Sequence, residues 1–166
     1  MMSRPLFYYM GEHLPQGMVE GISAFGNPAI WWTGIIAFVW VCFTVFSRTS
    51  KETGLLETHE QKWKRVFVLV SLLAQFVPWI FVKRSTYIYH YFATTPFLMM
   101  SIVFFFEDLI AHKSRKQQIV WISAYLLVCA VMFVLFYPLL AGTTIPASYA
   151  KHFRWFPSWV LYAYWQ

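Results

Sequence analysis

Four stretches of the chain contain no lysine, arginine, aspartate or glutamate. They cover residues 29–46, 66–82, 85–106 and 119–141. A helix needs about 20 apolar residues to cross a hydrocarbon core of roughly 30 Å, so each stretch is expected to span a membrane, the second being short for this. Only 12% of the 166 residues are charged, about half the fraction typical of soluble domains. The sequence predicts an all-α integral membrane protein with a four-transmembrane-helix bundle.

Two other classes of protein are excluded by the same pattern. A membrane barrel needs alternating strands of about ten residues separated by turns, and no such alternation is present. The net charge of +6 might suggest nucleic acid. Nucleic-acid binding needs a basic face on a folded module, whereas the lysines and arginines here are scattered between apolar runs. No nucleic-acid partner is expected.

The remaining residues are expected to flank the transmembrane domain of residues 29–141. Residues 1–28 have no continuous apolar core before a cleavage site, so they form an external arm rather than a signal peptide. Residues 142–166 form an external aromatic tail. Asn27 is expected to cap the first helix, with Pro28 at its first position. Pro96 indicates either a kink in the third span or the start of its helix.

Loop charges predict the orientation of the bundle. Lysine and arginine near span ends are retained on the cytoplasmic side. Five of the thirteen lie in 47–65 and three in 113–116, against five in the other segments together. Both termini are therefore expected to be extracytoplasmic in a multi-pass protein, in the plasma membrane of a bacterium or the endoplasmic reticulum of a eukaryote.

Few residues carry recognisable chemistry. There is no phosphate-binding glycine loop, HExxH, CxxC or GxSxG motif, and the five histidines are far apart, so no metal site is expected. Glu107 and Asp108 are adjacent, but they lie at the opposite end of the third span from Arg84. A nearby cation such as Lys113 or Arg115 is expected to pair with them.

The segment "KRSTYIYHYF", residues 83–92, permits two interpretations. Lys83 and Arg84 could extend to lipid headgroups beside a belt of tyrosines, which requires no further function. Alternatively, Arg84 and His90 could hold a phosphate, because a guanidinium matches phosphate oxygens and an imidazole can donate another hydrogen bond.

Two stretches carry a family resemblance. The segment "SRPLFYYMGEHLPQGMVEGISAFGNPAIWW", followed later by "RSTYIYHYFATTPFL", resembles the C-terminal four-helix region of the protein O-mannosyltransferases, membrane glycosyltransferases of the GT-C type. The strongest markers are Gly-Asn-Pro at 26–28 with Trp-Trp at 31–32, and Arg84 with Tyr-His-Tyr at 89–91 and Pro-Phe at 96–97. The resemblance covers nearly the whole chain and favours the phosphate-binding interpretation.

The resemblance implies transfer of mannose from a polyprenyl or dolichyl phosphate carrier to serine or threonine of exported proteins. It implies that donor-lipid contacts come from Arg84, His90, Tyr89 and Tyr91, with Lys83 a weaker candidate. The family's catalytic acids lie in an N-terminal half that is absent from this sequence, so the chain alone is expected to be inactive. Glu12 and Glu20 match none of those acids and are expected to be solvated. No cofactor is expected beyond the lipid-linked donor.

Two other functions remain open. The chain could be a non-catalytic membrane scaffold or accessory subunit that retained the family's fold, in which case its partners are membrane lipid and other subunits. A channel or transporter is less favoured, because no span carries a charged residue at its centre. In the preferred interpretation the partner is the missing N-terminal half or a related subunit.

Overall fold

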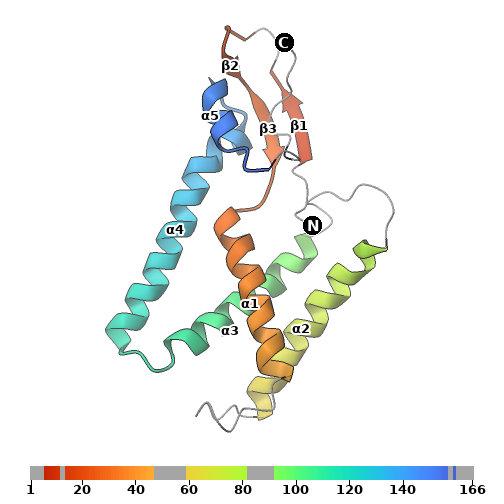
Figure 1. Cartoon of the computed structure of the whole chain (residues 1–166), viewed down its shortest axis with the longest axis vertical. Helices are drawn as coiled ribbons and strands as arrows, with labels where there is room; N and C mark the ends of the chain where they lie inside the picture. The colour runs from red at the N-terminus through yellow and green to blue at the C-terminus, as the bar shows by residue number, and fades with distance from the viewer. Residues whose placement is uncertain (1–5, 12–13, 47–58, 82–91, 157–158, 160–166) are drawn as a thin grey trace.

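In the part of the chain that the structure describes, four helices are long and apolar enough to cross a membrane. The structure, a computed structural model, describes residues 6–11, 14–46, 59–81, 92–156 and 159. The helices, which Figure 1 shows in order, are α1 (Pro28–Phe46), α2 (His59–Ile80), α3 (Thr95–Ile110) and α4 (Arg115–Ala141). With the helical turn that precedes it, α3 forms a candidate span over Phe92–Ile110. The expected multi-pass helical membrane protein is therefore confirmed.

Local sequence explains where α1 and α3 begin. The Asn27 Oδ1 atom accepts a hydrogen bond from the Ala29 N–H at 3.0 Å, and Pro28 occupies the first helical position, as predicted. Proline suits this position because its missing N–H would have no partner within the helix. Pro96 lies in the first turn of α3, so it marks a helix start and not a kink.

The polar ends of the other helices extend beyond the apolar runs. Helix α2 begins at His59, ahead of the expected 66, and α4 begins at Arg115, ahead of 119. Ser114 caps α4 in a capping box with Gln117, which fixes this start. The charge-free runs mark the part of each helix that fits in the hydrocarbon core of a membrane. The helices themselves continue beyond these runs into polar residues.

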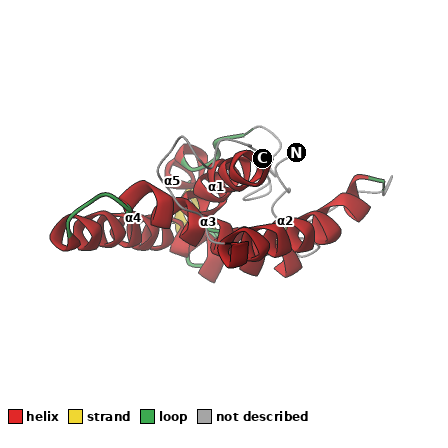
Figure 2. Ribbon diagram, turned by 90° about the horizontal axis from the view of Figure 1, so that it is seen from below, coloured by secondary structure: helices red, strands yellow, loops and turns green. Residues whose placement is uncertain are grey.

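Helices α1 and α3 pack closely at the centre of the bundle. A Cβ atom on Gly34 of α1 would lie 2.4 Å from Cγ of Leu98 of α3, so glycine is required for this approach. Figure 2 shows α4 and α2 on opposite sides of the molecule, with α1 and α3 between them. Helix α4 is mostly exposed, with large apolar side chains along its length.

The arm and the tail contain short strands, which no pattern in the sequence predicted. Strand β1 (Leu6–Met10) pairs with β3 (Gly21–Ala24), and β2 (Met18–Val19) pairs with β4 (Ile145–Pro146), both antiparallel. The tail continues as α5 (Ala147–His152). These elements gather at one end of the bundle, here called the arm end, where α1 and α3 begin and α2 and α4 finish (Figure 1). The opposite end is the loop end.

A single apolar cluster joins the arm, α4 and the tail. Its buried members are Phe136 and Leu139 of α4 with Ala150 and Trp159 of the tail. Six partly buried side chains surround them: Val19, Phe25, Met132, Ile145, Phe153 and Phe156. Residues from three distant parts of the sequence therefore form one core at the arm end.

Candidate functional site

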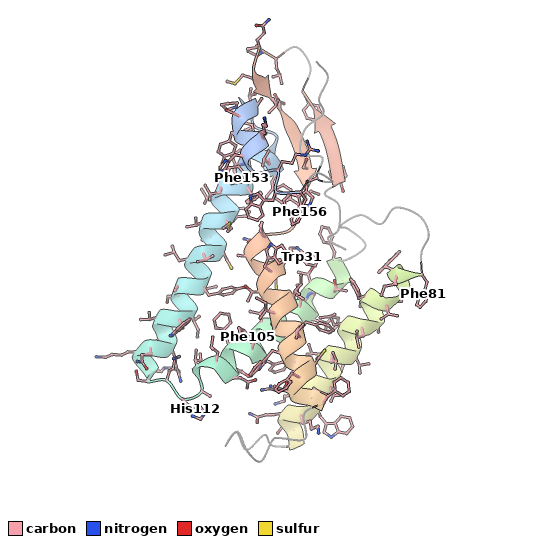
Figure 3. All side chains as sticks on the ribbon, viewed as in Figure 1. Trp31, Phe81, Phe105, His112, Phe153 and Phe156 are labelled. Atoms are coloured by element: carbon pink, nitrogen blue, oxygen red, sulfur yellow. The ribbon has the colours of Figure 1, made fainter. Side chains whose placement is uncertain are left out.

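The predicted donor-binding residues lie outside the described part of the chain. They are Lys83, Arg84, Tyr89, His90 and Tyr91. The described residues that flank them are Phe81, after the end of α2, and Phe92, before the start of α3, and both side chains are exposed. Figure 3 shows Phe81 at the C-terminal end of α2. The helices on either side of the predicted site thus end and begin at the arm end.

The aromatic side chains of the arm end pack together in one cluster. The Phe136 ring contacts Phe25 of the arm edge to face, with 5.1 Å between centroids, and Phe153 of the tail at 4.9 Å. Trp155 contacts Phe136 at 5.3 Å and stacks on Trp159. Aromatic pairs in these geometries contribute about 0.5 to 1.5 kcal/mol each beyond the burial of their surface. The cluster around Phe153 and Phe156 (Figure 3) therefore ties the tail to the bundle.

The Gly-Asn-Pro segment before α1 connects the arm to two helices. Asn27 Nδ2 donates to the Cys129 carbonyl of α4 at 2.8 Å, while its Oδ1 caps α1. A Cβ atom at Gly26 would lie 1.7 Å from Nε1 of Trp31, so only glycine leaves room for this indole. One of the strongest family markers in the sequence is therefore a structural joint between α1 and α4.

One carboxylate of the arm is held by the tail. Thr144 Oγ1 donates to Glu20 Oε2 at 3.1 Å, and the Glu20 carbonyl accepts from the Gly11 N–H at 3.1 Å. The Glu20 side chain is half-buried, and its hydrogen bond with Thr144 is exposed to solvent. Glu12 lies outside the described residues. The tail also brings Lys151 and Arg154 to the arm end, which adds positive charge there.

At the loop end, Asp108 forms a buried ion pair with Arg65 of α2. Arg65 Nη1 and Nη2 donate to Asp108 Oδ2 and Oδ1 at 2.7 and 2.6 Å, and the two side chains expose only 9% and 8% of their surface. The partner of Asp108 is therefore not Lys113 or Arg115, and that prediction was wrong. Arg65 falls within the predicted loop of residues 47–65, but in the structure it belongs to α2.

Other side chains complete this ion pair. Trp40 Nε1 of α1 donates to Asp108 Oδ2 at 2.7 Å, and Thr44 Oγ1 of α1 accepts from Arg65 Nη1 at 3.1 Å. The Arg65 guanidinium lies over the Phe104 ring, 5.5 Å from its centroid. Hydrogen bonds of this kind offset the cost of burying two charges. The network joins α1, α2 and α3 at the end opposite to the predicted donor site.

The described carboxylates are mostly occupied by structural contacts. Glu20 binds Thr144, Asp108 binds Arg65, and Glu60 pairs with Lys64 at 2.8 Å. Glu107 is exposed, but it lies in the last turns of α3 at the loop end. Within the described residues, no three metal-binding side chains gather. The described part of the arm end thus offers cations and aromatic surface, and its one carboxylate is engaged with the tail.

Comparison with known proteins identifies the family. Residues 1–159 match the model of the C-terminal four-transmembrane region of protein O-mannosyltransferase. A polyprenol-phosphate-mannose–protein mannosyltransferase of Corynebacterium glutamicum is 27% identical over 83% of this chain, and one of Mycolicibacterium smegmatis is 23% identical over 96%. These alignments cover 25% and 31% of the relatives' own lengths. No solved structure matches the chain significantly. The chain belongs to the family of C-terminal four-transmembrane regions of protein O-mannosyltransferases.

Proposed function

We propose that the chain is the membrane module of a protein mannosyltransferase that uses polyprenol phosphate mannose, and that it supplies the contacts to the lipid-linked donor. The observation that carries this proposal is the family match over residues 1–159. The relatives' names state both the donor and a protein acceptor. The segment with Arg84 and His90 connects α2 and α3, which end and begin at the arm end. From there, its side chains could reach the phosphate of a lipid at the membrane interface.

The reaction would need two kinds of group. The hydroxyl oxygen of serine or threonine forms a bond to the anomeric carbon of mannose, while the bond from that carbon to the carrier phosphate breaks. The hydroxyl proton passes to a general base, and the phosphate leaves with the electron pair. Cations stabilise the charge that develops on the phosphate. We assign the second role to Arg84 and His90, with Tyr89, Tyr91 and Lys83 around them.

The general base is proposed to lie outside this chain. Glu20 is engaged by Thr144, and Asp108 is engaged by Arg65 at the other end of the bundle. The relatives are three to four times longer than the region that aligns. A polypeptide equivalent to the part of the relatives outside the aligned region is therefore the proposed partner, and it would carry the catalytic acid.

The arm end is proposed to face out of the cytoplasm. The cation distribution between the loops supports this orientation. The arm and the tail share one core, so both lie on the same side of the membrane. An acceptor among exported proteins would then meet the donor at the arm end.

Titration of polyprenyl phosphate into the purified chain in nanodiscs tests the donor site. If Arg84 holds a phosphate through its fork, Arg84→Lys is not conservative. Arg84→Lys and His90→Ala should each weaken binding about tenfold, which corresponds to losing about 1.5 kcal/mol of a charged hydrogen bond. Lys83→Gln should have a smaller effect. Unchanged affinity in both variants, with the helical content retained, would contradict the donor-site assignment and leave the segment as an interface anchor.

A non-catalytic scaffold is the second candidate function. Its supporting observation is that Glu20 and Asp108 serve contacts within the fold. A scaffold would associate with a catalytic subunit but would bind polyprenyl phosphate no better than lipid vesicles do. The same titration separates the two functions, because only the donor module has a saturable site that depends on Arg84.

A further inference from the structure

Among the strands that the structure describes, β1 is paired along one edge only. It pairs with β3 along one side, and no other strand in the described part of the chain pairs with it. A strand directs alternate N–H and C=O groups to each side, so an unpaired edge presents a row of hydrogen-bonding groups. Tyr8 is the extra residue of a bulge between the pairs Phe7–Ser23 and Tyr9–Ile22.

The two strands of this sheet have different surroundings. Gly21 and Ser23 of β3 are buried, and β3 packs against α4. In β1, Tyr8 and Tyr9 expose 62% and 47% of their surface. β3 is therefore the inner strand and β1 the outer one.

The sequence of β1 lacks the charged residues and the proline that often protect an edge. Edge strands of soluble proteins often carry lysine, proline or a charged residue that points inward. These residues discourage pairing with another chain. The strand reads Leu-Phe-Tyr-Tyr-Met and contains none of these. Its bulge increases the local twist but leaves residues on both sides in the strand.

We infer that the open edge of β1 binds an extended segment of the acceptor polypeptide by adding it as a third strand. This inference rests on the proposed function, because the relatives' names specify a protein acceptor. Backbone hydrogen bonds recognise an extended chain whatever its side chains, and Tyr8 and Tyr9 add apolar contact. Alternate side chains of the added strand point to opposite faces, so a serine or threonine remains free to enter a reaction centre.

Peptide binding to the full chain in nanodiscs tests this inference. The probe is a fluorescent peptide of about eight residues with alternating threonine and valine, the length of a typical strand. Two further peptides carry N-methyl groups on the odd or on the even residues. In an added strand, either the odd or the even residues donate their N–H groups to β1, while the other set points away from it. One methylated peptide should therefore bind at least tenfold more weakly, and the other should bind like the unmethylated peptide. Equal affinity of the two would overturn the inference.

Two variants locate the binding at β1. Tyr9→Lys places a charge on the outer strand and should weaken peptide binding about tenfold or more. The matched control is Met18→Lys, since Met18 is an exposed apolar residue of the other two-stranded sheet at the arm end. It should leave peptide affinity unchanged. Equal losses in both variants, or self-association of the chain through β1 in place of peptide binding, would contradict the inference.

The peptide assay can fail independently of the donor assay. If the chain does not bind polyprenyl phosphate but the two N-methylated peptides differ in affinity as expected, the proposed donor function is contradicted and β1 remains a peptide-binding strand. Saturable donor binding without the N-methyl pattern would contradict only the inference about β1.

Discussion

Arg65 and Asp108 are individual residues whose burial makes them sensitive to change. Removing one partner of a buried ion pair leaves a charge without compensation, whereas replacing both by apolar groups can be nearly neutral. The pair also holds Trp40 and Thr44, so it connects α1 with α2 and α3. We therefore expect the loop end of the bundle to depend on both charges together.

Arg65→Met or Asp108→Leu alone should lower the free energy of unfolding by about 3 to 5 kcal/mol. The double variant should recover more than half of this loss, because it leaves no buried charge. Unfolding in mixed micelles of increasing SDS content measures the effect. The control is Lys64→Gln, which breaks the exposed pair with Glu60 and should cause no measurable change. Additive losses in the double variant would contradict this account.

Asn27 performs two tasks that substitution can separate. Asn27→Ala removes both the cap of α1 and the hydrogen bond to Cys129, and it should cost about 1 to 2 kcal/mol. Asn27→Ser keeps a capping oxygen but is too short to reach α4, so it should cost less than Asn27→Ala. The same unfolding assay measures both variants. Equal losses would mean that the cap contributes nothing.

At the scale of elements, the contact between α1 and α3 depends on Gly34. Gly34→Ala introduces a Cβ atom 2.4 Å from Leu98 Cγ, so the helices must separate or the leucine must move. We expect a loss of about 1 to 3 kcal/mol. Combining it with Leu98→Ala should give less than the sum of the single effects. Ile36→Ala, on the exposed surface of α1, should change stability little in detergent. A fully additive double variant would contradict the predicted clash.

The helices could be predicted from the sequence, but the strands could not. Apolar runs without charge must satisfy their backbone hydrogen bonds internally in a membrane, which leaves the helix as the structure. Asn27 and Pro28 added a local signal for the start of α1. Strands β2 and β4 contain two residues each, too few for any periodicity, and they pair across most of the sequence.

The charge-free runs did not predict the partner of Asp108, because Arg65 and Asp108 both lie in helical turns beyond those runs. Arg65 immediately precedes the second apolar run and Asp108 closely follows the third. Opposite charges just beyond two antiparallel spans at the same membrane face are a signal that could have suggested the pair. The donor residues Arg84 and His90 stay a prediction, since they lie outside the described residues.

At the scale of the whole molecule, the orientation can be tested by thiol labelling. In a variant without Cys42 and Cys129, a single cysteine at Ser148 on α5 should react with an impermeant thiol reagent in intact cells. A single cysteine at His112, in the exposed loop before α4 (Figure 3), should be protected until the membrane is opened. Labelling of His112→Cys from outside, with protection of Ser148→Cys, would reverse the proposed orientation.

We propose that this chain contributes donor binding to an enzyme whose catalytic acid lies elsewhere. The most direct measurement is mannose transfer from polyprenol phosphate mannose to a threonine peptide, by the purified chain alone and after assembly with the N-terminal part of the Corynebacterium glutamicum relative. We predict no transfer by the chain alone, transfer by the assembly, and a loss of at least tenfold with Arg84→Lys. Robust transfer by the chain alone, or an assembly whose activity is unaffected by Arg84→Lys, would contradict this proposal.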